Sequence, residues 1–244
     1  GGWCKAIQFR KQVMMRKHAP IPTEWWADFL LNQYSRSRRL GYFLSGVVLV
    51  LLPVFTILDA TLVSYSNGEL IWKHILLRLP AAILAITFLL LHHKKDPGFW
   101  AYPLLLTLNL SIVGMTAAMF VLHYSEQGGH LLYITQGLTL AIIAVATATV
   151  YGVRDLVLIY GLPFMAVIAF IVFSGSPVPD NPIHLIFIPA AMGIGLVIAT
   201  MLYQEHQRTF IASQQLEHSA LTDALTGLPN RRSMHTHLQS EWSR

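Results

Sequence analysis

The sequence predicts an all-α membrane protein: a six-transmembrane-helix bundle with an N-terminal interfacial amphipathic helix and a C-terminal cytoplasmic signalling helix. Hydrophobic residues make up 54% of the 244 residues and charged residues only 12%, which is not the composition of a soluble domain of this length. Six apolar runs are also long enough to cross about 30 Å of hydrocarbon as helices. These predicted spans cover about residues 41–63, 71–91, 99–122, 131–150, 156–173 and 183–203.

An amphipathic helix is expected over residues 23–39, within a cytoplasmic tail of residues 1–40. Thr23 follows a Pro-Ile-Pro turn and can cap this helix. Large apolar side chains then recur at helical spacing: Trp26, Phe29, Leu30 and Tyr34. A helix of this kind lies among the lipid headgroups and anchors the first span. A sharper interpretation is that it packs on the signalling helix and restrains it.

Basic residues are segregated along the chain. All 17 Lys and Arg residues except Lys73 and Arg78 fall in the N-terminal tail, the second and fourth connections between spans, or the C-terminal segment. The positive-inside bias therefore predicts that both termini are cytoplasmic. The net charge of +5 is explained by this topology and by anionic headgroups, so no nucleic-acid partner is expected.

Polar side chains inside the spans are the candidate ligand-binding residues. Arg78 lies about 10 Å inside the second span, where an unpaired cation costs several kcal/mol. Asp59, near the outer end of the first span, is the nearest acidic residue; either the two form an interhelical ion pair, or Arg78 holds the acidic or carbonyl head of a ligand. An outer-half polar pocket would add five more side chains: His74, Asn109, His123, Gln136 and His184. Asn109 and Gln136 also suit packing hydrogen bonds between helices.

No metal site and no cofactor are predicted for this chain. The single cysteine, Cys4, excludes an internal disulfide and a Cys-rich metal site. The 11 histidines form no motif that fixes a coordination geometry, and only outer-face His123, His130 and His184 can be paired in a plausible one.

Small residues mark helix faces that can approach a neighbour closely. They form one stripe on the fourth predicted span and another on the sixth: Gly137, Ala141, Ala144 and Ala148, then Gly193, Gly195 and Ala199. Each stripe is a packing surface, either inside the bundle or at a dimer seam.

The most specific motif follows the last span. Residues 223–232 read Asp-Ala-Leu-Thr-Gly-Leu-Pro-Asn-Arg-Arg. Taken alone, this run indicates a helix, a turn and a second helix. It resembles the D-x-L-T-G-L-x-N-R-R segment that joins a signalling helix to the catalytic domain in the GGDEF family of diguanylate cyclases.

The resemblance implies a regulatory module in a bacterial inner membrane. Residues 204–222 would be the signalling helix and dimer stalk, and residues 223–244 the truncated start of a domain that condenses two GTP molecules, with Mg²⁺, into cyclic di-GMP. The G-G-[DE]-E-F signature is absent, so no catalytic residue is assigned. The residues implied in relaying the signal are Leu216, Asp223, Thr226, Gly227, Asn230 and Arg231.

Two other functions stay open. A non-sensing membrane anchor or dimerisation scaffold has the same composition. A small transporter can use Arg78 and Asp59 in a substrate path, but it leaves residues 223–232 unexplained and the chain has no pair of broken-helix repeats. A sensor differs from an anchor in binding a small-molecule stimulus, here a hydrophobic or anionic one.

Overall fold

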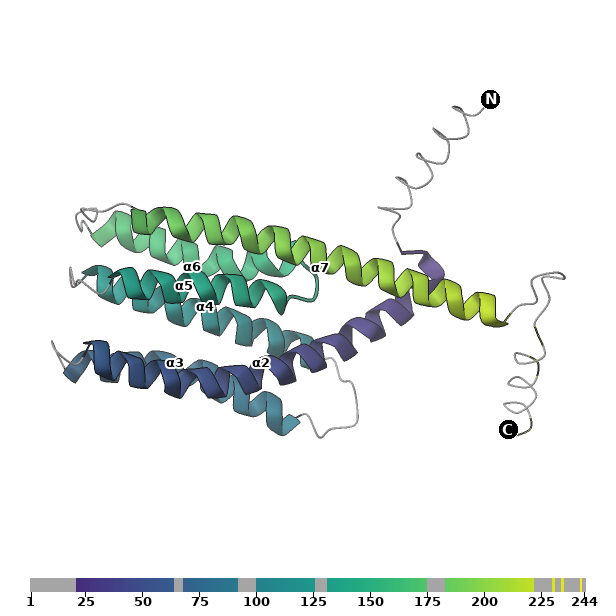
Figure 1. The fold of residues 1–244 in the computed structure, drawn as a ribbon, viewed down its shortest axis with the longest axis horizontal. Helices are drawn as coiled ribbons and strands as arrows, with labels where there is room; N and C mark the ends of the chain where they lie inside the picture. The colour runs from purple at the N-terminus through teal and green to yellow at the C-terminus, as the bar shows by residue number, and fades with distance from the viewer. Residues whose placement is uncertain are drawn as a thin grey trace, which may run out of the picture. The chain divides into compact units, whose positions relative to one another are not determined.

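A computed structural model describes residues 21–63, 68–91, 100–125, 131–174 and 183–221, together with residues 230, 234 and 242 (Figure 1). This part of the chain is almost wholly helical and contains no strand. The elements are η1 (Thr23–Trp25), α2 (Trp26–Val63), α3 (Gly68–Leu91), α4 (Ala101–Ser125), α5 (Leu131–Thr147), α6 (Val153–Ser174) and α7 (Ile183–Leu221). The predicted all-α class is therefore confirmed for the described residues.

Five of these helices are long and apolar enough to cross a membrane: α2, α3, α4, α6 and α7. The helix at the fourth predicted span, α5, has only 17 residues. It stops before residue 150 because the chain turns there: Gly152 has a φ of 62°, which favours glycine. The carboxylate of Asp155 also accepts the backbone N–H groups of Val150 and Tyr151 at 2.8 and 2.9 Å, so these groups need no helical acceptor.

The predicted separate amphipathic helix is not separate in the structure. It is the first part of α2, which runs without a break from Trp26 to Val63. Residues 35–41 contain no proline, and Gly41 is held by packing against Phe88: a Cβ added at Gly41 would lie 2.0 Å from the ring. The signalling helix likewise continues the last span within α7.

The chain divides into two compact units, one of residues 31–204 and one that joins residues 1–30 to residues 205–244. In the larger unit, α4 is the central helix, because it contacts α3, α5 and α6. Figure 1 shows α4 and α5 side by side. In the smaller unit, Phe29 is fully buried and packs on Phe210 and His206 of α7, with ring centroids 5.2 and 6.0 Å apart.

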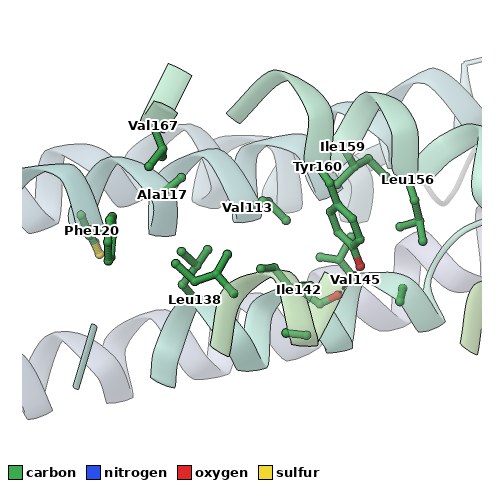
Figure 2. Close-up of a cluster of buried hydrophobic side chains, with 14 of the residues drawn as sticks. Val113, Ala117, Phe120, Leu138, Ile142, Val145, Leu156, Ile159, Tyr160 and Val167 are labelled. Atoms are coloured by element: carbon green, nitrogen blue, oxygen red, sulfur yellow. Dashed lines mark hydrogen bonds between the residues drawn. The ribbon is translucent and has the colours of Figure 1, made fainter. Parts of the chain in front are cut away.

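The main core lies between α4, α5, α6 and α7 (Figure 2). Its residues recur every three or four positions, as expected for helices that bury one face. The hydroxyl of Tyr160 donates to the carbonyl of Ile142 at 2.7 Å. A Cβ on Gly195 would lie 2.5 Å from that hydroxyl, and Ala199 is fully buried. Two residues of the small-residue stripe of α7, Gly195 and Ala199, are thus used inside the bundle, whereas the third, Gly193, is exposed.

Candidate functional site

Four ionisable side chains from three helices meet in a cluster with little access to solvent. Asp59 comes from α2, His74 and Arg78 from one face of α3, and His123 from α4. The three residues other than Arg78 are each 1% exposed, and Arg78 is 7% exposed. The spacing of His74 and Arg78, four residues apart, brings both side chains to the same neighbour.

Asp59 is the centre of this cluster. Its Oδ2 accepts from Nη2 of Arg78 at 2.6 Å and from Nδ1 of His74 at 2.7 Å. Nη1 of Arg78 donates to the hydroxyl of Thr56, one turn before Asp59, at 2.9 Å. The interhelical ion pair that the sequence left open is therefore present, with His74 as a second donor to the same oxygen.

The second nitrogen of His74 faces another imidazole. Nε2 of His74 and Nε2 of His123 lie 2.9 Å apart, and the ring planes are inclined by 67°. A hydrogen bond between them needs one N–H and one lone pair, so one of the two nitrogens is protonated and the other is not. Asp59, His74 and His123 thus form a chain of three titratable groups across three helices.

An apolar cavity of about 390 Å³ begins at this cluster. Among the described residues, α2, α4 and α5 form its walls, and Asp59 and Arg78 close one end. The lining residues are Leu44, Val47, Val48, Leu51, Leu52, Phe55, Asp59, Arg78, Ile112, Met115, Thr116, Met119, Ile134, Gly137, Leu138, Leu140, Ala141, Ala144 and Val145. The Thr116 hydroxyl bonds the carbonyls of its own helix, which leaves Asp59 and Arg78 as the polar groups available to a ligand.

The cavity reaches the outer surface of the bundle. Two of its lining residues, Leu51 on α2 and Leu140 on α5, are 43% and 62% exposed. The α5 stripe of Gly137, Ala141 and Ala144 forms the opposite wall, and a Cβ added at Gly137 meets nothing within 4 Å. This small-residue stripe therefore leaves space instead of closing a helix contact.

The other predicted pocket residues do not join this cluster. Asn109 is buried on α4, fourteen residues or about 21 Å of helix before His123, and its amide donates to the carbonyl of Ala148 at 3.4 Å. Gln136 is exposed on α5. His184 lies in α7, but its side chain is outside the described residues, as is all of His130.

The predicted relay residues fall mostly outside the described part of the chain. Leu216 lies on α7 and is 72% exposed. Asn230 is described, and its carbonyl accepts the backbone N–H of Met234 at 3.0 Å. Asp223, Thr226, Gly227 and Arg231 are not described.

A second polar cluster stabilises the connection between α5 and α6. Asp155 accepts the hydroxyl of Tyr102 at 2.8 Å in addition to two backbone N–H groups. Burial, together with nearby Tyr34, Asp155 and Tyr203, raises the pKa of Tyr151 above its ordinary value. Tyr151 is therefore a neutral phenol that packs edge-on against Tyr102, with ring centroids 4.9 Å apart. All of these groups stabilise the turn between α5 and α6, so the role of this cluster is structural.

Sequence reasoning missed Thr56, and it named His123 as a possible pocket residue without pairing it with His74. Thr56 precedes Asp59 by three residues and so shares its helix face, a signal that could have found it. His123 carries no such local signal, because its partner His74 lies 49 residues earlier. Within the described residues, no group of three or more His, Cys, Asp or Glu side chains is arranged to hold a metal ion.

Comparison with known proteins adds no relative. No protein-family model matches the chain, and no curated protein and no solved structure resembles it significantly.

Proposed function

We propose that this chain is the membrane-integral sensory and dimerisation module of a diguanylate cyclase, and that its stimulus binds in the cavity between α2, α4 and α5. The observation that carries the proposal is the buried Asp59, His74, Arg78 and His123 cluster at the end of an apolar cavity. The output is inferred from the resemblance of residues 223–232 to the start of a GGDEF domain. A single helix, α7, leads from the bundle toward that segment.

The cavity must be filled in the membrane. An empty apolar space would leave the side chains that line it without packing partners, which costs stability. Because the space opens beside exposed Leu51 and Leu140, a lipid chain or a membrane-soluble compound can occupy it. Exchange of one occupant for another gives the bundle a means of sensing.

The cluster favours a sensor over the two other functions. An anchor needs no ionisable groups in its interior, where each charge is costly unless paired. A transporter needs polar groups along a path. Beyond Asp59 and Arg78, the described cavity walls offer only the Thr116 hydroxyl, which bonds its own helix, and Asn109 lies about 21 Å of helix away from His123. A polar cluster at the end of an apolar slot suits recognition of a ligand head.

The topology of the proposed module has six spans, with both termini in the cytoplasm of a bacterium and the bundle in its inner membrane. The 17 residues of α5 meet the lower length limit of about 17 for a spanning helix. Basic residues on the even-numbered connections and the termini support this orientation. The module is proposed to act as a homodimer, because cyclase domains of this family work in pairs, and GTP and Mg²⁺ are needed only by the intact parent.

A chimera tests the sensing function without knowledge of the stimulus. Residues 1–222 are joined to a complete GGDEF domain, and cyclic di-GMP production is measured in native membranes. Gly137→Leu fills the cavity, so it should change the output severalfold. Gly161→Leu is the matched control, since it also has no atom within 4 Å of an added Cβ but does not line the cavity. Equal output from both variants and the parent chimera would make the bundle an anchor.

A further inference from the structure

The shape of the cavity suits a hydrocarbon chain. Its lining residues on α2 run from Leu44 to Asp59, which lie fifteen residues or about 22 Å of helix apart. The space of about 390 Å³ is therefore spread along about 22 Å of helix, an elongated shape that an extended chain matches.

The polar end of the cavity favours a ligand head that accepts hydrogen bonds. Arg78 is the more accessible member of the ion pair, with 9% of its side chain exposed against 2% for Asp59. It gives one hydrogen bond to Asp59 and one to Thr56 among the described residues, out of five N–H donors on a guanidinium. Asp59 already accepts two donors on one oxygen. A ligand head that accepts hydrogen bonds therefore meets Arg78, and the planar fork suits a carboxylate.

Charge balance explains the two histidines. With both imidazoles neutral, Asp59 and Arg78 cancel, and an added carboxylate would leave one uncompensated negative charge in an apolar interior. Imidazole is the side chain that changes its charge near neutral pH. His74 can hold a proton on each nitrogen, donating from Nδ1 to Asp59 and from Nε2 to His123. The groups facing His74 are Asp59 from α2, Arg78 from its own helix and His123 from α4.

We propose that the sensor ligand is a single-chain fatty acid, whose carboxylate binds Arg78 while the His74 and His123 pair takes up one proton. Before binding, both rings are neutral, with the proton of His74 on Nδ1 and that of His123 on Nε2. On binding, the Nε2 proton of His123 moves to Nε2 of His74, and Nδ1 of His123 takes one proton from the solvent. His74 is then an imidazolium and His123 remains neutral. This inference rests on the proposed function, since it names the ligand class of the same cavity. An extended chain advances about 1.2 Å per bond, so about 22 Å suits a chain of roughly 16 to 18 carbons.

Binding to the purified chain in phosphatidylcholine nanodiscs tests the inference. Radiolabelled hexadecanoate, hexadecanesulfonate and hexadecanol are compared, with empty nanodiscs as the partition control. The two anions should bind saturably and compete with each other, and the alcohol should bind at least tenfold more weakly. Adding phosphatidylglycerol should not displace hexadecanoate; displacement would assign the site to an anionic phospholipid and overturn the fatty acid.

The sulfonate separates proton uptake by the protein from protonation of the ligand, because it stays ionised throughout. Its affinity should fall by up to about tenfold per unit between about pH 6 and about pH 8, the limit for uptake of one proton. His74→Gln combined with His123→Gln should abolish this dependence, because no imidazole then remains in the cluster, and His206→Gln, a histidine of the other compact unit, should keep it. A sulfonate affinity that does not vary with pH in the unaltered chain refutes the proton linkage, whatever the variants do.

One set of results would overturn only the fatty acid as ligand, and another would overturn the sensing function as well. Hexadecanol binding as tightly as hexadecanoate, with both lost in Gly137→Leu, would overturn the acid but leave the cavity as a ligand site. No saturable binding of any of the three compounds, together with an unchanged chimera output in Gly137→Leu, would overturn the sensing function as well.

Discussion

Removing one partner of the Asp59 and Arg78 pair should destabilise the bundle, and removing both should restore much of the loss. Arg78→Leu removes the donor 2.6 Å from a carboxylate that is 2% exposed. An uncompensated buried charge of this kind costs about 3–5 kcal/mol. The cost should lie near the lower figure, because Nδ1 of His74 still donates to Asp59 at 2.7 Å.

The double variant Asp59→Leu with Arg78→Leu removes both charges. Replacing a buried ion pair by apolar side chains is commonly neutral or stabilising. One penalty remains, because Nδ1 of His74 loses its acceptor, which costs about 1–3 kcal/mol. Thr56 is little affected, since its hydroxyl also donates to the carbonyl of Leu52 at 2.8 Å. The double variant should therefore be more stable than Arg78→Leu alone.

Thermal unfolding of the purified chain in nanodiscs measures this cycle. At about 2–4 °C per kcal/mol for a protein of this size, Arg78→Leu should lower Tm by about 6–12 °C. The double variant should recover at least half of that shift, which gives the two sites a favourable coupling energy. A double variant as unstable as the single one would refute the claim that the two charges stabilise each other.

Three further predictions use the same chain. Reporters placed after Arg244 or between Lys94 and Lys95 should read cytoplasmic, and reporters at Gly128 or Pro179 external; an external C-terminus would contradict the cyclase assignment. The purified chain, given GTP and Mg²⁺, should make no cyclic di-GMP, since residues 223–244 lack the G-G-[DE]-E-F turn. If a clean preparation made cyclic di-GMP, the chain would contain catalytic residues, which we have not assigned. Gly41→Ala should lower Tm because its methyl group would lie 2.0 Å from Phe88, whereas Gly46→Ala on the same helix meets nothing within 4 Å and should be neutral or stabilising; equal Tm values would place Phe88 elsewhere.

The helices were predictable from sequence because apolar runs of this length have few alternatives to a membrane helix. The ends of the helices were less predictable. The arginines between Tyr34 and Gly41 suggested a boundary, yet α2 continues through them, because arginine is a good helix former and Gly41 is supported by Phe88. The early end of α5 depends on Asp155, whose contacts with Val150 and Tyr151 no periodicity contains.

The site could be predicted only where an unpaired buried charge would cost enough free energy to require a partner. A cation at the depth of Arg78 needs a partner, and Asp59 was the nearest acidic residue on the neighbouring helix. His123 could not be paired with His74 in the same way, since a neutral imidazole imposes no comparable penalty and either residue could have faced other groups. The direction of Gln136, which is exposed on α5, could not be derived from the sequence either, because one polar amide costs less than a buried charge and does not fix the face on which it lies.

The cavity had no sequence signal of the usual kind, because hydropathy gives the same value to an apolar side chain that faces lipid and to one that faces an apolar space. The two side chains differ in the unfilled volume beside the one that faces the space. Gly137, Ala141 and Ala144 recur on one face of α5, where a closely packed partner helix would be expected. Instead, α2 faces them across the space with Leu44, Val48 and Leu52. Small residues opposite large apolar ones, with a buried ion pair at one end, define the slot that we propose a chain with a polar head occupies.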